Sequence, residues 1–159
     1  MKNQLRKLNQ GFTIIEVLIV LAIAGLILAI VFLAVPALQR NSRNTSIRSD
    51  SASVLAGVND YVANNNGALP AASGAQAGPT INIGAGAAAA EAKVRGSTTV
   101  TIIAAGCGGA APALGNINIR TGCKCNPAGT ASVAAARAVT AEFLIEPNSG
   151  APAPQCIES

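Results

Sequence analysis

An uninterrupted apolar run near the start of the chain limits what this sequence can fold into more than any other feature. The run extends from Val17 to Val35, close to the roughly 20 residues that an α-helix needs to cross the hydrocarbon core of a membrane. Residues 1–10 are mostly polar and carry three basic side chains and no acid. Because basic flanks stay in the cytoplasm, we expect this helix to insert with its N-terminus inside and the remainder of the chain outside.

A single carboxylate, Glu16, stands at the beginning of the run and closes the hexapeptide Gly11-Phe12-Thr13-Ile14-Ile15-Glu16. An ionisable group inside a membrane is costly, so by default it is a functional residue whose partner has to be found. A plain signal anchor with an acid near its end is one alternative. A cleaved secretory signal is another, but it has a shorter apolar region followed by small residues.

This order of glycine, aromatic residue, carboxylate and apolar run resembles the class III leader of the type IV pilin family, which includes the pseudopilins. The resemblance is detailed over residues 1–36 and rests on architecture beyond them. It implies that residues 1–11 are a leader peptide, that prepilin peptidase cuts between Gly11 and Phe12, and that the new N-terminal Phe12 is methylated. It also implies a role for Glu16 in assembly, where the Phe12 amine of a neighbour neutralises a carboxylate that is costly when unpaired.

The helix is predicted to extend over residues 12–66 and to span the membrane up to about residue 38. Between Ile47 and Val62, apolar residues recur at spacings of three, four and seven with polar residues between them. This pattern predicts one apolar stripe lying against a folded domain. The sequence Asn64-Asn65-Asn66-Gly67, followed by Pro70, predicts the C-terminal end of the helix.

Gly25 and Pro36 are the predicted weak points of this helix. Proline in a helix interior removes one hydrogen bond and clashes with the preceding turn, so a kink is expected at Pro36. Glycine costs about 1 kcal/mol relative to alanine in an exposed helix. Many pilins pair a glycine with a downstream proline and lose helical order between them in the assembled filament. The resemblance implies the same for Gly25 and Pro36, whereas a simple kink is expected in the isolated subunit.

Residues 67–159 predict a β-rich head, and the chain therefore belongs to the α+β class, with a long helix packed on a small antiparallel sheet. Residues 98–103, 116–120 and 139–146 predict strands, because they are β-branched or alternate between apolar and polar residues. Residues 71–92 are low in complexity, and a surface loop is predicted over much of this region. In the last strand, we expect one set of side chains to face inward (Val139, Ala141, Phe143 and Ile145) and the other to face outward (Thr140, Glu142 and Glu146).

All four cysteines, Cys107, Cys123, Cys125 and Cys156, lie in the predicted head. An even number of cysteines beyond a membrane anchor favours two disulfides. Since one residue separates Cys123 from Cys125, we expect them to pair with the other two cysteines, in a crossed or nested arrangement. A metal site built from Cys107, Cys123 and Cys125 is the weaker alternative, because C-x-C is not the usual zinc spacing and histidine is absent.

The composition argues against catalysis and against nucleic-acid binding. Histidine and tryptophan are absent, which removes histidine acid–base chemistry and imidazole metal ligands. We predict no enzyme activity, catalytic residue, bound metal or cofactor. The formal charge of +4 falls to +1 without the three basic residues of the leader, since eight basic residues then face seven acids. The remaining basic residues form no stripe, so DNA is not an expected partner.

The resemblance implies a pilin, the structural subunit of a type IV pilus, that polymerises with itself. Its expected partners are prepilin peptidase, the pilus assembly machinery in the membrane, and a host or partner cell surface. It would reside in the inner or cytoplasmic membrane and then in an extracellular filament used for adhesion or twitching motility. The alternatives are a type II secretion pseudopilin, a DNA-uptake pilin and a membrane-tethered adhesion module. A pseudopilin of the major kind implies a calcium site, which the scattered acids after Asp60 do not favour.

Overall fold

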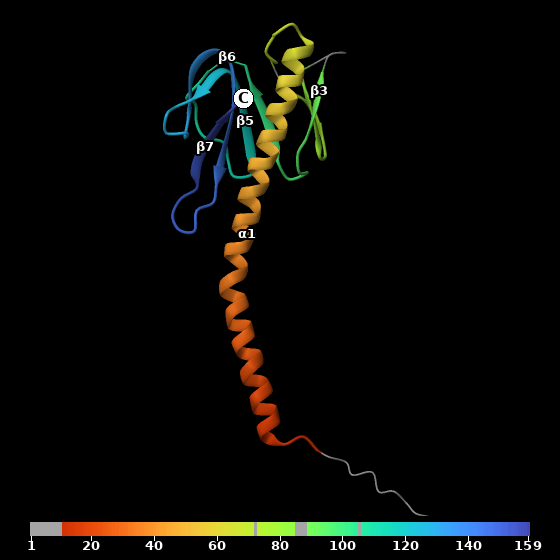
Figure 1. Ribbon diagram of the computed structural model, residues 1–159, viewed down its shortest axis with the longest axis vertical. Coiled ribbons are helices and arrows are strands. Elements are labelled where there is room, and N and C mark those ends of the chain that lie inside the picture. Colours follow the sequence, from red (N-terminus) through yellow and green to blue (C-terminus); the bar gives the residue numbers. More distant parts are fainter. Residues whose placement is uncertain (1–10, 72, 85–88, 105) are drawn as a thin grey trace, which may run out of the picture. The chain divides into compact units, whose positions relative to one another are not determined.

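A computed structural model describes residues 11–71, 73–84, 89–104 and 106–159 (Figure 1). The chain divides into two compact units after Leu38, which we call the N-terminal unit and the C-terminal unit. Helix α1, Ile14–Asn64, begins in the first and ends in the second. It is two residues shorter at each end than the predicted helix, and Pro36 lies inside it.

In the N-terminal unit, α1 presents apolar side chains to its surroundings on every side. Every large apolar side chain between Ile14 and Val35 is exposed, from 38% at Val35 to 82% at Ile14. By length and composition, α1 is able to cross a membrane. A helix that is apolar all round is stable when lipid or other helices surround it.

In the C-terminal unit, α1 buries the stripe that its sequence predicts. The buried helical residues are Ser46, Ile47, Asp50, Ser51, Val54, Leu55, Gly57 and Val58. The helix ends as predicted at the asparagine run: Asn66 has a φ of 52° and Gly67 a φ of 82°. The Gly67 N–H donates to the Val62 carbonyl at 2.9 Å, which is the Schellman arrangement.

Three short strands form the first sheet of the C-terminal unit: β1 Ser73–Ala77, β2 Thr80–Ile83 and β3 Ala90–Lys93. They pair antiparallel in the order β1-β2-β3. The prediction of a surface loop over much of residues 71–92 is wrong for residues 73–77, 80–83 and 90–92, and residues 72 and 85–88 lie outside the described residues. These strands are rich in alanine and carry a weak β signal, but Ile81 and Ile83 are fully buried and hold β2 against the core.

Four strands form the second sheet: β4 Thr99–Ile103, β5 Asn116–Cys125, β6 Ser132–Ile145 and β7 Ala153–Glu158, in the order β4-β5-β6-β7. The predicted α+β class is confirmed, but the single antiparallel sheet is wrong, because β4 and β5 pair in parallel. The connection between them returns the chain to the end of the sheet where β4 began. In Figure 1, α1 lies between β3 and the strands of the second sheet.

Two polar side chains predicted to face solvent are buried instead, and so is one aspartate from among the polar residues of the helical stripe. Thr140 is completely buried and Glu142 is 4% exposed, although the alternation of β6 predicts both to point outward. Asp50, on the polar side of the predicted helical stripe, is 6% exposed. The carboxylates are tolerated because they are hydrogen-bonded: Asp50 accepts from the Thr98 hydroxyl at 2.6 Å, and Glu142 pairs with Arg120.

The hydrophobic core joins α1 to both sheets. Val54 and Val58 of the helix, Ile83 of the first sheet, and Ile117 and Phe143 of the second sheet belong to one buried cluster. Phe143 is the largest side chain in it. A core with so little aromatic surface stabilises weakly, so cross-links contribute more of the stability.

Gly84 supplies a sharp test of the packing between the first sheet and α1. Its φ is +81°, and an added Cβ would lie 2.1 Å from Cε2 of Tyr61. We expect Gly84→Ala to destabilise the protein by about 1–3 kcal/mol, because both the backbone conformation and the ring oppose it. Gly78→Ala is the matched control, since its φ is +60° with open space around it. Thermal unfolding of the detergent-solubilised chain measures both, and equal losses would show that the Tyr61 contact is unimportant.

Candidate processing and assembly site

Two reciprocal hydrogen bonds between Thr13 and Glu16 cap the N-terminal end of α1. The Glu16 N–H donates to the Thr13 hydroxyl at 3.3 Å, and the Thr13 N–H donates to Glu16 Oε2 at 2.8 Å. The Thr13 hydroxyl also donates to Oε2 at 2.7 Å. This is a capping box, in which the N-cap residue and the third helical residue satisfy each other's free N–H groups.

Sequence reasoning singled out Glu16 and overlooked Thr13. The signal was present, since a threonine followed three residues later by a glutamate before an apolar run is the signature of a capping box. The structure gives the carboxylate a local partner within its own chain. The position is also electrostatically favourable, because the N-terminal end of a helix stabilises negative charge.

Gly11 and Phe12 precede the helix and lie in an open segment. Phe12 is 89% exposed, and an added Cβ on Gly11 would meet nothing within 4 Å. The peptide bond between them is therefore outside any secondary structure and accessible to another molecule.

Gly25 is equally open, and α1 continues through both Gly25 and Pro36. The kink at Pro36 and the loss of helical order between Gly25 and Pro36 in a filament stay predictions.

Residues 6–32 match the family model of the prokaryotic N-terminal methylation motif. This match covers the N-terminal segment and supports a type IV pilin-like prepilin with a class III leader. The match includes Gly11, Phe12 and Glu16 and most of the apolar run. No curated protein and no solved structure matches the chain. Proteins with this motif form a structural, pilin-like or pseudopilin family, associated with the membrane before assembly and processed by a peptidase.

Two disulfides cross-link the C-terminal unit, Cys107–Cys123 and Cys125–Cys156. The four cysteines pair as two bridges, as the sequence predicts, and neighbouring Cys123 and Cys125 do not pair with each other. The two loops are consecutive, so the description of the pairing as crossed or nested is wrong. The alternative of a cysteine metal site is wrong as well, because all three of its proposed ligands are in disulfides. Each bridge typically contributes about 2–4 kcal/mol.

The connection between β4 and β5 is also fixed by a buried ion pair. Arg120 Nε donates to Glu142 Oε2 at 2.6 Å, and its Nη1 donates to the Gly106 carbonyl at 2.6 Å. The second carboxylate oxygen of Glu142 accepts from the Ser132 N–H at 2.8 Å. Within the described ranges, no group of three or more His, Cys, Asp or Glu side chains is placed to hold a metal ion. These charged groups act as cross-links between strands and the connecting segment.

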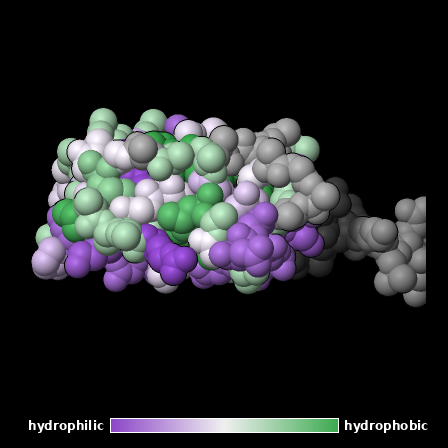
Figure 2. All heavy atoms as spheres, turned by 90° about the horizontal axis from the view of Figure 1, so that it is seen from above, coloured by the Kyte–Doolittle hydropathy of each residue, from purple (hydrophilic) through white to green (hydrophobic). Residues whose placement is uncertain are grey.

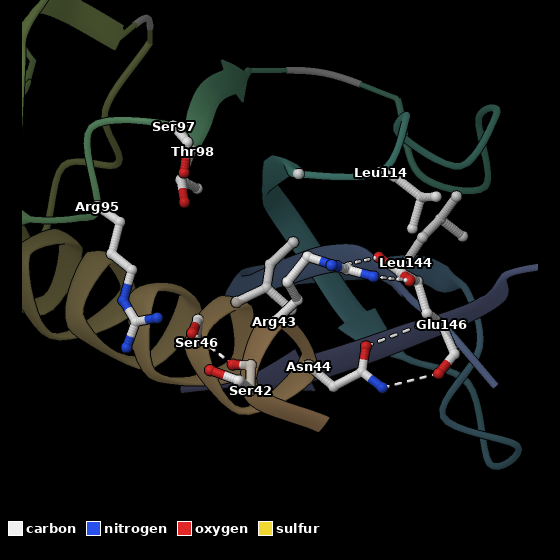
Figure 3. A pocket seen from close by; sticks show the side chains of 12 residues that line it. Ser42, Arg43, Asn44, Ser46, Arg95, Ser97, Thr98, Leu114, Leu144 and Glu146 are labelled. Carbon is white, nitrogen blue, oxygen red and sulfur yellow. Dashed lines mark hydrogen bonds and ion pairs between the residues drawn. The ribbon is translucent and has the colours of Figure 1, made fainter. Parts of the chain in front are cut away.

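A second cluster fastens the end of β6 to α1 inside the C-terminal unit (Figure 3). Arg43 contacts Glu146 with two hydrogen bonds, Nε to Oε1 at 2.7 Å and Nη2 to Oε2 at 2.6 Å. Asn44 bonds the backbone of Glu146 twice, donating to its carbonyl and accepting from its N–H, both at 2.8 Å. Asn44 begins a glycosylation-type sequon with Thr45 and Ser46, but both ends of its amide are already engaged.

The Arg43–Glu146 contact makes stability depend on pH. The hydrogen bond from Arg43, followed by the positive charges of Arg43 and Arg40, holds the pKa of Glu146 below its ordinary value. The stabilisation is therefore fully present above the unfolded pKa of a glutamate, and it is lost as the pH falls through the lower folded pKa.

We expect Glu146→Gln to lower the melting temperature at pH 7 and to lower it less as the pH falls below about 4.5. The variant keeps the shape of the side chain and removes the charge. Glu91→Gln is the control, because Glu91 is exposed and has no hydrogen bond or ion pair among the described residues. Melting curves of the three proteins from pH 7 to pH 3 measure the effect. A gap between wild type and Glu146→Gln that stays constant with pH would contradict this interpretation.

Proposed function

We propose that this chain is the structural subunit of a type IV pilus filament, cleaved and N-methylated before it assembles from the membrane. One observation carries the proposal: a carboxylate opens an exposed apolar helix immediately after a Gly-Phe step that lies in the methylation motif. Capping the helix gives this carboxylate a role in a single chain, and a bundle of such helices would give it a second one, pairing with a neighbour's amine.

Processing would remove residues 1–11 and leave a positive amine on Phe12. The open segment at Gly11 and Phe12 supports this step, because a peptidase needs an extended, accessible chain. The new amine would lie next to the capping box of Thr13 and Glu16. Methylation keeps the amine basic and therefore preserves its positive charge for the next step.

In assembly, Glu16 would exchange or extend its partners. Its bonds to Thr13 satisfy the carboxylate of an isolated subunit with neutral donors. A neighbour's Phe12 amine would add an opposite charge, so that both the donor and the acceptor of the new hydrogen bond would be ionised. Inside a filament, the low dielectric makes this pairing more favourable and an unpaired carboxylate more costly. The charge of Glu16 would thereby fix the position along its helix at which the N-terminus of a neighbouring helix docks.

Helix packing would supply most of the assembly energy. The exposed apolar surface of α1 in the N-terminal unit would leave lipid and pack against the same surface of other copies. Such packing is driven by close contact of the side chains and by the ordering of lipid. The disulfide-bonded C-terminal unit would then face the exterior, where an oxidising environment preserves both bridges. The partners are thus other copies, prepilin peptidase, the assembly machinery and, at the surface, another cell.

Gly11→Val tests the processing step. Valine places a branched side chain where the peptidase is expected to require a small residue. Full-length protein should remain in the membrane, and filaments should be absent from the cell surface. Gly11→Ala is the control, since it adds a single methyl group and should be processed to a greater extent. Mass spectrometry of membrane and sheared fractions measures both, and mature-length subunits from Gly11→Val would refute a class III cleavage.

Glu16→Gln tests the assembly step. The amide keeps the size of the side chain but removes the charge, so a contact of about 1.5–3 kcal/mol per subunit is lost. Processed subunits should accumulate in the membrane while the filament yield falls severely. Thr13→Val separates docking from capping, because it removes the hydroxyl at a cost of about 1 kcal/mol and leaves the charge; filaments should persist. Abundant Glu16→Gln filaments of normal length would show that the charge is dispensable.

A further inference from the structure

Three arginines follow the apolar run of α1 before any acidic residue does. They are Arg40, Arg43 and Arg48, and the first acid beyond the run is Asp50. In the orientation that the basic leader predicts, this flank lies outside the cell, where basic residues oppose the orientation of the helix. The arginines at this end of the run therefore need an explanation other than helix orientation.

Measured along α1, Arg40 lies at the depth of phospholipid headgroups when the helix spans a membrane. The apolar run from Val17 to Val35 is about 28 Å long at 1.5 Å per residue, and the hydrocarbon core that it has to cross is roughly 30 Å thick. Arg40 then lies about 7.5 Å beyond the core, within a headgroup layer that is about 5–8 Å thick on each side. Arg43 and Arg48 lie farther out, about 12 and 20 Å beyond the core.

The guanidinium group of Arg40 makes no hydrogen bond or ion pair within the described part of the chain, and its Nε is buried. Arg40 lines a cavity of about 240 Å³ together with Leu114, Glu146 and Pro147. Glu146 is the acid of this cavity, but Arg43 binds both of its carboxylate oxygens, at 2.7 and 2.6 Å (Figure 3). A buried donor without an acceptor is unfavourable, so Arg40 is suited to an acceptor that comes from outside the chain.

A phosphate group suits the chemistry and the size of this cavity. The planar guanidinium of arginine matches phosphate oxygens with two parallel N–H donors, and Arg40 and Arg43 against Glu146 leave a local charge of +1. The cavity has about eight times the volume of one water in the liquid, roughly 30 Å³. In Figure 2, hydrophilic side chains also gather along one edge of the C-terminal unit, so a polar surface alone selects no site. The unpartnered donor at headgroup depth distinguishes Arg40.

We propose that Arg40 binds the phosphate of an anionic phospholipid from the outer leaflet, in the cavity lined by Leu114, Glu146 and Pro147. This inference goes beyond the proposed function, because it concerns a single subunit in the membrane and requires no filament. The membrane-spanning part of α1 keeps headgroups beside Arg40 at a high effective concentration, so one phosphate contact is enough to select anionic lipid. Leu114, which is 46% exposed, provides an apolar contact for the rest of the headgroup region.

Lipid titration of the full-length chain in detergent micelles tests the proposal, with bound lipid counted by native mass spectrometry. The wild-type chain should bind phosphatidylglycerol more tightly than phosphatidylcholine. Arg40→Gln should weaken phosphatidylglycerol binding about fivefold, the effect of about 1 kcal/mol, and leave phosphatidylcholine binding unchanged. Arg48→Gln is the matched control, because it removes the same charge from an exposed residue of the same helix that lines neither cavity near Glu146.

Two results of the titration would overturn the proposal. Equal affinity of the wild-type chain for the two lipids is the first, and it needs no variant. An equal loss of phosphatidylglycerol binding in Arg40→Gln and Arg48→Gln is the second, because it would show a diffuse attraction by net charge. Melting curves check the folding of each variant. If Arg40→Gln unfolds, Leu114→Glu places an acid in the same cavity and should also weaken phosphatidylglycerol binding, and unchanged binding would overturn the proposal.

Inorganic phosphate separates a lipid headgroup from a soluble anion. Because acyl chains hold the lipid beside α1, inorganic phosphate at the same concentration should not displace phosphatidylglycerol from the wild-type chain. If inorganic phosphate displaces it and raises the melting temperature of the wild-type chain but not of Arg40→Gln, the cavity is a site for soluble anions and the proposal is overturned. None of these results bears on filaments, so the proposed function stands or falls separately, by whether cells with the wild-type chain assemble them.

Discussion

The placement of one carboxylate at the start of an exposed apolar helix is the constraint on which the N-terminal unit depends. Glu16 has a local partner in Thr13, but the apolar surface that follows it has none in the N-terminal unit. Water does not tolerate so much apolar surface, and lipid does not favour the charge. In the proposed assembly, similar helices would cover the apolar surface and a neighbour's amine would pair with the carboxylate. The N-terminal unit is thus built for an environment that the chain does not itself provide.

The C-terminal unit meets a different constraint, a small core with little aromatic surface. Two disulfides, Cys107–Cys123 and Cys125–Cys156, connect β5 to the segment before it and to β7. Arg120 and Glu142 add a buried ion pair between β5 and β6. The disulfides restrict the unfolded chain, and together with the ion pair they fix connections that apolar burial alone would leave loose. They also leave the outer surface free to carry charges for contacts with other molecules.

Local sequence patterns predicted the helices and strands that are specified by residues close together in the sequence. The helical stripe from Ile47 to Val58, the helix end at Asn66 and Gly67, and the strands around residues 99–103 and 139–145 follow from periodicity and from turn chemistry. The first sheet did not, because β1, β2 and β3 are short and alanine-rich, and they become strands only when Ile81 and Ile83 are buried beneath α1. The alternation of β6 also gave a wrong prediction of exposure, since Thr140 and Glu142 point into a sheet face that the β4–β5 connection helps to cover.

The sequence by itself determined the membrane-competent helix, the methylation motif, the Glu16 carboxylate and the oxidation of the cysteines, because each depends on residues close together or on composition. Only the tertiary structure decided the parallel pairing of β4 with β5, the choice between the two disulfide arrangements, and the contact of Arg43 with Glu146. Arg43 and Glu146 lie 103 positions apart in the sequence. Such contacts depend on how the strands are ordered in space, and no local pattern of residues encodes that order.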